Sequence, residues 1–540
     1  MSSHAVPWDR RAAAARAGAG SSLARTVAAW ITPDRVYQTV LTAGLFAIVV
    51  KRGIGDPDLP WHLRTGELVA RLHWAPTRDA FSSHAGAPFV AYSWLAEIVM
   101  WLLATGVGFH ALRIVTGAIA AWTFLLVYRT CRDLAAAPAL ALVATGVAGL
   151  ATLPYVAERP TIVSFLLAAF FARRLGAYVR GRRVRLWPLV PATVLWANVH
   201  VFFVYAVGWV WLAAAWTFVR ARLPGPATVA RPTPLVAAAV AVTAATLVNP
   251  YGAGLLAHVR LLASHPAALP IVELGSPNFH LTESRIFLLF LLAFVAAIAW
   301  SSEPPEPYLF ALALGNLALA LDVQRNIPVF VILAAPLLAR AASLTPVRAL
   351  FTAPEHGMPP RHALAHAALA AVFVAIAVVR LPTAPALEAN VSPRTWPFAA
   401  VRFLRAQPPL GRMANHYNWG GFLVWALPEY RVSIDGRATF YGEPEVLRAM
   451  KLIQLKPGWR GELERMAPDF VFWERRAPLA TALAGDPGWT KVYADDLATI
   501  FLRADHPLRR VVKRAARRWL LPGPPPPASA RPASARVSTF

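Results

Sequence analysis

Acidic, basic and aromatic side chains gather in residues 55–67, which read Gly-Asp-Pro-Asp-Leu-Pro-Trp-His-Leu-Arg-Thr-Gly-Glu. A carboxylate such as Asp56 or Asp58 can take the proton of an acceptor hydroxyl, most readily where burial raises its pKa. The guanidinium of Arg64 offers a planar fork that holds phosphate oxygens with two parallel hydrogen bonds. Trp61 suits a membrane interface or the face of a sugar. The alternative is an acidic loop in which Asp58 caps a helix.

A divalent metal is also compatible with this region. Asp79 follows in the same loop and could join Asp56 and Asp58 around a cation, because hard cations prefer carboxylate oxygens. A surface turn is the other interpretation of Asp79. The chain has one cysteine, Cys131, which excludes an internal disulfide and a cysteine-rich metal cluster. No cofactor is required by the sequence, and a metal stays optional.

The composition decides the class of protein that must hold these residues. The chain has 540 residues, of which 57% are hydrophobic and 15% charged. Soluble domains are less apolar and carry about 25% charged residues, so a polytopic membrane protein with a smaller soluble part is expected. The net charge of +25 comes mainly from arginine, and we attribute it to the orientation of membrane helices and a basic tail. No nucleic-acid-binding motif is present in the sequence, so nucleic acid is not an expected partner.

Apolar stretches separated by polar breaks predict the membrane helices. They are centred on residues 36–50, 92–109, 110–128, 135–153, 160–175, 186–200, 202–219, 234–249, 286–300, 307–321, 328–343 and 363–380.

The distribution of Lys and Arg indicates whether the stretch 92–109 crosses the membrane. If it lies along the surface and the other eleven cross with the N-terminus inside, the inner segments carry 19 Lys and Arg and the outer segments 9. If 92–109 crosses, that ratio inverts and the arginine cluster at 173–185 moves outside, against the positive-inside rule. We therefore predict about eleven transmembrane helices, N-in and C-out, with a surface juxtamembrane helix in the first outer loop, 51–109.

In this topology the unusual polar motifs all reach the outer side. Polar groups at membrane depth are costly and usually line a cavity, so one outward-facing site is expected. Glu97 lies in an apolar stretch and must face that cavity or pair with an arginine. The motifs contain Asp56 and Asp58, Glu158 and Arg159, Asn198 and His200, Asn249 and Tyr251, and Asp322 and Arg325.

The predicted organisation has four parts. Residues 1–35 form a basic cytoplasmic N-terminus and residues 36–380 the transmembrane domain. Alternating segments such as 470–473 and 430–435, with a helical stretch at 445–455, predict a small extracytoplasmic α/β domain over 390–505. Residues 506–540 are basic and then Pro-rich, and their composition predicts disorder.

The layout resembles the GT-C membrane glycosyltransferases, which include protein O-mannosyltransferases, aminoarabinose lipid A transferases and single-subunit oligosaccharyltransferases. The resemblance rests on the acidic motif at 55–67 after the first span, and on the segment from Tyr92-Ser-Trp-Leu-Ala-Glu97 to Arg113. The region Asn415–Trp425, followed by Arg431–Arg437, is similar to the start of outer domains in that superfamily. A Trp-Trp-Asp motif is not present, so peptide recognition is not carried over.

The resemblance implies a transferase in the cell membrane that uses a polyprenyl-phosphate-linked sugar donor and a glycan, lipid or protein acceptor on the extracytoplasmic side. Asp58 or Asp56 would be the catalytic base, and Arg64, Arg159 and Arg325 candidates for holding phosphate. The full set of expected substrate-binding residues is Trp61, His62, Arg64, Glu67, Glu97, Glu158, Arg159, His200 and Arg325. Two alternatives stay open: a non-catalytic assembly partner with the same fold, and a transporter or flippase of a lipid-linked or anionic substrate.

Overall fold

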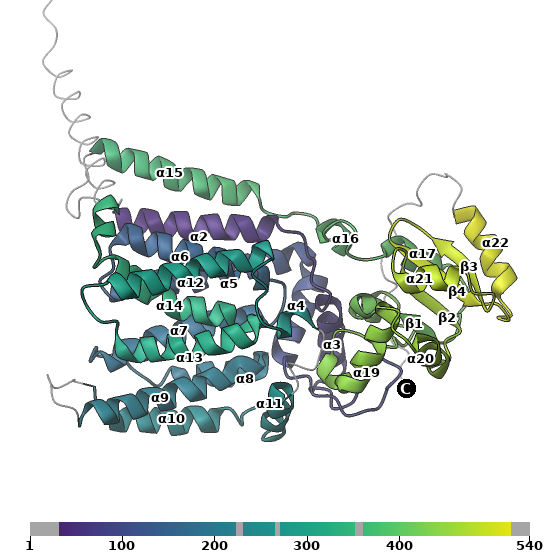
Figure 1. Ribbon diagram of the computed structural model, residues 1–540, viewed down its shortest axis with the longest axis horizontal. Helices are drawn as coiled ribbons and strands as arrows, with labels where there is room; N and C mark the ends of the chain where they lie inside the picture. Colours follow the sequence, from purple (N-terminus) through teal and green to yellow (C-terminus); the bar gives the residue numbers. More distant parts are fainter. Residues whose placement is uncertain (1–31, 223–229, 265–270, 352–359, 520–540) are drawn as a thin grey trace, which may run out of the picture. The chain divides into compact units, whose positions relative to one another are not determined.

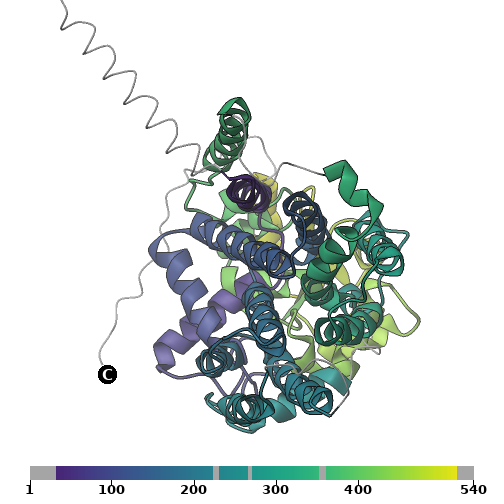
Figure 2. The ribbon, with the colours of Figure 1, turned by 90° about the vertical axis from the view of Figure 1, so that its left-hand side faces the viewer.

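The computed structural model describes residues 32–222, 230–264, 271–351 and 360–519, which form two compact units (Figures 1 and 2). The first unit comprises the described chain up to Thr395 together with Gly436–Leu447, and the second comprises Trp396–Asp435 and the chain from Arg448 onward. The predicted domain 390–505 is thus divided, because 390–395 and 436–447 belong to the first unit. Most of the predicted N-terminal segment 1–35 and the end of the tail 506–540 lie outside the described residues.

The first unit is built of helices, several of which run side by side along its length (Figure 1). Their bounds are α2 (Pro33–Lys51), α3 (Leu59–Leu72), α4 (Trp94–Gly106), α5 (Phe109–Asp133), α6 (Pro138–Thr152), α7 (Thr161–Val179), α8 (Leu189–Val199), α9 (Val204–Arg220), α10 (Pro232–Ala245), α11 (Gly254–Ser264), α12 (Thr282–Trp300), α13 (Pro307–Asp322), α14 (Ile327–Ala342), α15 (Pro360–Val379) and α16 (Leu387–Asn390).

Among the described residues, six helical stretches are long and apolar enough to cross a membrane. They are Phe109–Asp133, Pro138–Tyr155, Thr161–Val179, Val201–Arg220, Thr282–Trp300 and Gln324–Ala342. Six further apolar helices are shorter, among them α4, α8, α10 and α13. Helix α8 has 11 residues, which at about 1.5 Å per residue is less than a bilayer core. The finding supports a membrane protein, and the eleven crossings and their orientation stay predictions.

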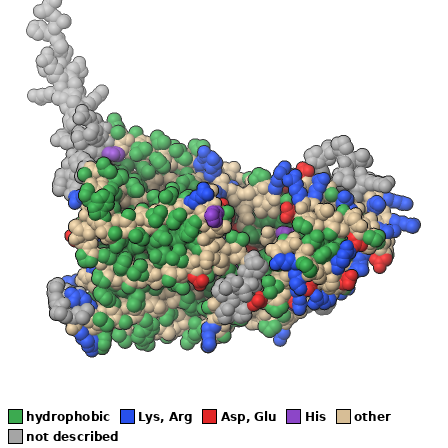
Figure 3. Space-filling model, viewed as in Figure 1, with side chains coloured by type: hydrophobic (Ala, Val, Ile, Leu, Met, Phe, Trp, Pro, Cys, Tyr) green, Lys and Arg blue, Asp and Glu red, His purple; other side chains and the backbone are tan. Residues whose placement is uncertain are grey.

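Large apolar side chains cover the outside of the helical unit, as Figure 3 shows for one face. Exposed examples on α12 are Leu289, Leu292 and Val295, and α15 exposes Val372 and Val378. An apolar surface of this extent is unfavourable in water but is favourable in contact with the hydrocarbon chains of lipid. Helix α14 is the opposite case, since nearly all of its side chains are buried among its neighbours.

The predicted arginine-rich loops meet at one end of the helical unit. Helix α2 begins there, α5 and α7 end there, and ion pairs tie these ends together. The pairs are Arg132 with Asp34 at 2.8 Å, and Asp133 with Arg173 at 2.9 Å and Arg182 at 3.0 Å. The acidic stretch 55–67 follows the other end of α2, so the two charge clusters lie at opposite ends of this helix.

The second unit contains a four-stranded sheet of order β1-β2-β4-β3. Strand β1 (Met413–Asn415) pairs in parallel with β2 (Phe470–Glu474), and β4 (Ala498–Arg503) pairs antiparallel with β2 and with β3 (Trp489–Ala494). The register places Met413 opposite Phe470. The helices around it are α17 (Phe398–Arg405), α18 (Gly420–Ala426), α20 (Trp459–Met466), α21 (Pro478–Ala484) and α22 (Arg509–Trp519).

Two local predictions in this region have different outcomes. The alternating segment 470–473 lies in β2, and the helical stretch at 445–455 lies mostly in α19 (Ala438–Ile453), which is kinked at Gly442. The strand expected over 430–435 is wrong, because no strand is assigned there in the described chain. Only Val432 is assigned as a single β-bridge residue, and the backbone N–H of Ser433 donates to Oδ1 of Asn415 at 2.8 Å.

Candidate active site

The acidic stretch forms a tight turn between α2 and α3. The backbone N–H of Asp58 donates to Oδ1 of Asp56 at 2.8 Å, a turn typical of aspartate. Asp58 occupies the position before α3, but its side chain makes no capping hydrogen bond to the described chain. Its carboxylate is therefore available to other partners, and capping of α3 does not explain it.

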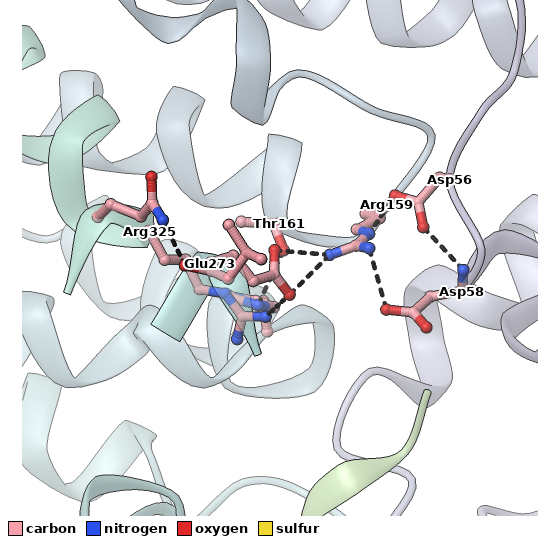
Figure 4. A network of polar contacts seen from close by, with 9 residues as sticks. Asp56, Asp58, Arg159, Thr161, Glu273 and Arg325 are labelled. Atoms are coloured by element: carbon pink, nitrogen blue, oxygen red, sulfur yellow. Dashed lines mark hydrogen bonds and ion pairs between the residues drawn. The ribbon is translucent and has the colours of Figure 1, made fainter. Parts of the chain in front are cut away.

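Arg159 joins this turn to a distant part of the chain (Figure 4). It lies in the short loop before α7, and its Nη2 is 3.1 Å from Oδ2 of Asp58. Its Nε contacts the carboxylate of Asp56, and its Nη1 lies 3.1 Å from Oε2 of Glu273. One guanidinium thus contacts three carboxylates from two separate segments.

Glu273 and Arg325 complete the network. Glu273 lies in the one-turn helix η3 (Val272–Leu274), and its Oε1 contacts the guanidinium of Arg325 in η4 (Gln324–Asn326). The backbone N–H of Gln324 donates to the carbonyl of Gly275 at 2.9 Å, which holds the two turns together. Because η4 leads directly into the buried helix α14, the most enclosed helix of the unit positions Arg325.

Burial and charge act in opposite directions on these carboxylates. Burial raises the pKa of Asp58 to about 7, although Arg159 acts to lower it. Burial also opposes the ionisation of Glu273, but Arg325 and Arg159 outweigh it and lower the pKa of Glu273 to about 2. The site therefore combines a carboxyl group that gains and loses a proton near neutrality with one that stays ionised. That combination suits proton transfer beside a fixed charge pair.

His200 lies next to the network and is held by α7. Its Nε2 lies 3.0 Å from Oγ1 of Thr161, and its Nδ1 lies 3.0 Å from Oγ of Ser164. Burial, with Arg325 and Arg159 nearby, lowers the pKa of His200 to about 3. The ring is neutral at physiological pH, and both of its nitrogens already have protein partners.

His62 and Glu97 form a separate buried pair between α3 and α4. Nδ1 of His62 lies 2.7 Å from Oε1 of Glu97, and the two side chains are 5% and 1% exposed. Burial lowers the pKa of His62 well below its usual value and raises that of Glu97 well above it, so burial favours the uncharged form of each. The helices approach closely because residue 66 is glycine: a Cβ there would overlap the carbonyl oxygen of Glu97.

Three other predicted residues have local partners. Arg64 pairs with Glu67 three residues later, and Glu67 also contacts Arg71, so these side chains form a cluster on α3 apart from the network. Trp61 is buried, and its ring lies 3.6 Å from that of His62 between centroids. The phosphate contact expected for Arg64 therefore has less support than the one expected for Arg159 or Arg325.

Glu158 lies immediately beside the network. It is buried near Asp56 and Arg113, and burial, with Asp56 adding to it, raises the pKa of Glu158 to about 7. Glu158 therefore lies beside these carboxylates, and it is not part of the ion pairs that link Arg159, Glu273 and Arg325.

Asp79 is engaged by other groups. Its Oδ1 lies 2.6 Å from Nη1 of Arg437, and its Oδ2 accepts a hydrogen bond from the hydroxyl of Ser82 at 2.7 Å. Within the described ranges, no group of three or more His, Cys, Asp or Glu residues has the arrangement needed to hold a metal ion. The three-aspartate metal site considered from the sequence thus gains no support, since the carboxylate of Asp79 already has partners.

Two residues of this region, Glu273 and Tyr92, were not among the site residues predicted from the sequence. Glu273 bridges the two arginines, but it lies in a long outer loop with no motif to mark it. Tyr92 lies where the charges of Arg325, Glu97 and Asp58 act on its hydroxyl, and burial raises its pKa to about 12. Its proximity depends on the packing of α4 and could not be read from spacing alone.

Of the comparisons with known proteins, the one with solved structures finds matches. No protein-family model matches the chain, and no curated protein sequence matches it. Seventeen chains of solved structures match. One is the crystal structure of ArnT from Cupriavidus metallidurans bound to undecaprenyl phosphate, with 12% sequence identity, a TM-score of 0.45, and coverage of 89% of this chain and 98% of that chain. Neither value is high enough to carry that protein's activity or its lipid over to this chain.

Proposed function

We propose that this chain is an integral membrane glycosyltransferase that transfers a sugar from a polyprenyl-phosphate-linked donor to an acceptor on the extracytoplasmic side. The observation that carries the proposal is the position of Arg159, between the carboxylates of Asp56 and Asp58 on one side and the Glu273–Arg325 pair on the other. A proton acceptor and two guanidiniums that can bind phosphate thus lie in one network. The sequence also resembles the GT-C superfamily in the acidic motif at 55–67 and in the segment from Tyr92 to Arg113.

In this mechanism Asp58 is the general base. Its carboxylate takes the proton of the acceptor hydroxyl or amine while the acceptor atom bonds to the anomeric carbon of the sugar. The bond between that carbon and the phosphate oxygen breaks, and the phosphate leaves with the electron pair. Its developing negative charge is stabilised by Arg159 and Arg325. Asp56 holds Arg159 and the backbone of Asp58, so its role is to orient both.

The network carries more acid than base, which bears on how a phosphate binds. Asp56, Asp58 and Glu273 face two guanidiniums, those of Arg159 and Arg325. An anionic donor must therefore take over guanidinium contacts that Glu273 now makes. Arg325 is the more accessible of the two, with 31% of its side chain exposed against 20% for Arg159. We propose that the phosphate meets Arg325 first.

The location of the site supports an extracytoplasmic reaction. The arginine cluster at 173–185 and the acidic turn follow opposite ends of the helical unit, and the positive-inside rule assigns the arginine-rich end to the cytoplasm. The network would then open to the other side of the membrane, where the resemblance expects a polyprenyl-linked donor to be used.

The test uses the purified full chain in lipid nanodiscs with a panel of polyprenyl-phosphate sugars. Binding and release of the free lipid phosphate are compared for wild type, Asp58→Asn and Arg325→Gln. Arg71→Gln is the matched control, because Arg71 is an exposed arginine on α3 that pairs with Glu67, outside the network. We expect Asp58→Asn to bind donor without turnover, and Arg325→Gln to lose binding. Movement of the intact donor across the membrane without cleavage would contradict the proposal and favour a flippase.

An assembly partner predicts a different result from the same panel. In one outcome, wild type and Asp58→Asn give equal amounts of product. In the other, neither gives product with any donor, but both support the same cellular phenotype. Either outcome would show that the carboxylates do no chemistry, and the transferase proposal would fail.

A further inference from the structure

Gly436 is the first residue of a segment, 436–447, that belongs to the same compact unit as the helices. A Cβ built on Gly436 would overlap Oδ1 of Asp58, and the indole nitrogen of Trp61 lies 3.5 Å from the same position. The backbone of Gly436 therefore covers one oxygen of the Asp58 carboxylate, while the other oxygen faces Arg159. Only glycine leaves room for this approach.

The neighbouring residue, Arg437, anchors the segment to the first outer loop. Its Nη1 lies 2.6 Å from Oδ1 of Asp79, and the two side chains are 2% and 0% exposed. Asp79 also accepts hydrogen bonds from the hydroxyl of Ser82 at 2.7 Å and from its backbone N–H at 3.0 Å. Burial opposes the charge of Asp79, but Arg437 and Ser82 keep its pKa below the usual value, so the pair is ionised. A buried ion pair with this many partners fixes geometry strongly.

Aromatic rings surround the guanidinium of Arg437. Its central carbon lies 5.2 Å from the ring centroid of Phe81 and 5.0 Å from that of Phe89, both in the outer loop. It lies 4.8 Å from the ring of Phe440 and 5.8 Å from that of Tyr441, both in its own segment. A guanidinium at these distances from ring faces gains cation–π energy that the ammonium of lysine matches less well. The rings also join the two segments, since Phe89 and Phe440 lie edge to face.

The outer loop is fixed in turn to the rest of the helical unit. The hydroxyl of Tyr251 donates to the carbonyl of Pro76 at 2.8 Å and accepts from the N–H of Ala91 at 2.9 Å. Both ends of the loop 76–91 are thus tied to the turn before α11. Contacts therefore run without interruption from Tyr251 through the loop to Arg437 and Gly436, and then to Asp58.

We propose that Arg437 is a positioning residue whose contacts with Asp79 and the aromatic rings hold the Gly436 backbone over Asp58, so that residues 436–441 form the acceptor-side wall of the site. The proposal rests on the proposed function in that Asp58 is the base. Oδ2 of Asp58 faces Arg159, where phosphate would bind, so the acceptor must come to Oδ1 past the wall.

A labelling experiment tests the wall without requiring activity. Asp58→Cys is introduced into the full chain, whose native Cys131 is buried, and the rate of reaction with a water-soluble maleimide is measured in nanodiscs. We expect Arg437→Met to raise that rate about tenfold, because the wall opens more often when its anchor is lost. Asp79→Asn should raise it less, since the aromatic contacts remain. Arg78→Met is the control, because Arg78 lies in the same loop and its guanidinium donates to the carbonyl of Gly86 within that loop.

Equal labelling rates in Arg437→Met, Asp79→Asn and the control would overturn the proposal. If Arg437→Met does not yield folded protein, the milder Asp79→Asn variant decides, and an unchanged rate in it counts against the wall. Arg437→Lys should fall between wild type and Arg437→Met, because it keeps the charge but loses the planar contacts with the rings.

Activity measurements separate this proposal from the proposed function. With the wall loosened in Arg437→Met, water reaches Asp58, and the acid limb of the pH–rate profile should move to lower pH. The other charged groups that face Asp58, which are Asp56, Arg159 and Glu273, are unaltered. We expect kcat to fall with the donor KM unchanged. If Arg437→Met speeds labelling but the wild type transfers no sugar, the transferase proposal is wrong and the positioning role of Arg437 is retained. If the wild type transfers sugar but Arg437→Met leaves the pH–rate profile unchanged, the positioning role is wrong.

Discussion

Nη2 of Arg159 lies 3.1 Å from Oδ2 of Asp58, although the two residues are 101 positions apart in the chain. The contact brings the turn after α2 against the loop before α7. Because Arg159 also contacts Asp56 and Glu273, its removal would affect every charged group of the site at once.

The first prediction concerns the two aspartates. Asp58→Asn should lower kcat by about 10²–10⁴-fold, the range for loss of a general base, with donor binding retained. Asp56→Asn should lower kcat less, because it weakens only the orientation of Arg159 and of the Asp58 backbone. Single-turnover assays with radiolabelled donor measure both. A larger loss in Asp56→Asn than in Asp58→Asn would reverse the assignment of the base.

The second prediction concerns stability. Arg159→Met leaves the carboxylates of Asp56 and Asp58 without their cation, and removal of one partner of a buried pair costs about 3–5 kcal/mol. We expect a clear drop in the thermal unfolding midpoint in nanodiscs. The double variant Arg159→Met with Asp56→Asn should recover part of it, because one of the stranded charges is removed. Unchanged stability in the single variant would show that water already solvates these carboxylates.

The third prediction concerns pH. Since burial raises the pKa of Asp58 to about 7, its base form grows as the pH rises, and kcat/KM should increase up to about pH 7 and then level off. For stability the sign is opposite: the raised pKa favours the folded state below about pH 3.8, and this contribution is lost as the pH rises through about 7. A pH–rate profile of the wild type measures the first effect. The same limb in Asp58→Asn would assign it to another group.

The fourth prediction concerns the buried pair of His62 and Glu97. Glu97→Gln keeps a hydrogen-bond partner for His62 and should change the free energy of unfolding little. Glu97→Leu leaves the ring nitrogen buried and unpaired, which costs about 1–3 kcal/mol. Thermal unfolding of both variants provides the comparison. If Glu97→Gln is as damaging as Glu97→Leu, the ionised carboxylate matters and the pair is not neutral.

The fifth prediction concerns topology. Ser83→Cys in the first outer loop should react with a membrane-impermeant thiol reagent on intact cells. Arg183→Cys, in the arginine cluster, should react only after permeabilisation; both native residues are exposed, and the native Cys131 is buried. The reverse pattern would place the acidic turn in the cytoplasm and contradict an extracytoplasmic reaction.

The sequence by itself determined the class of protein and the acidic and basic residues worth testing. Long apolar stretches allow few alternatives to membrane helices, and the density of charge at 55–67 is visible without any fold. It also indicated Arg159 and Arg325 as candidates, since charged side chains next to apolar spans are costly unless they have a function or a partner.

The tertiary structure decided which of those residues meet. Arg64 is close to Asp58 in sequence but pairs with Glu67, because side chains three residues apart face each other on a helix. Glu273 had no motif, and it enters the network only because η3 and η4 pack together. Arg437 meets Asp79 across more than 350 residues of chain. Ion pairs of this kind depend on packing between distant segments, and neither local periodicity nor composition contains that information.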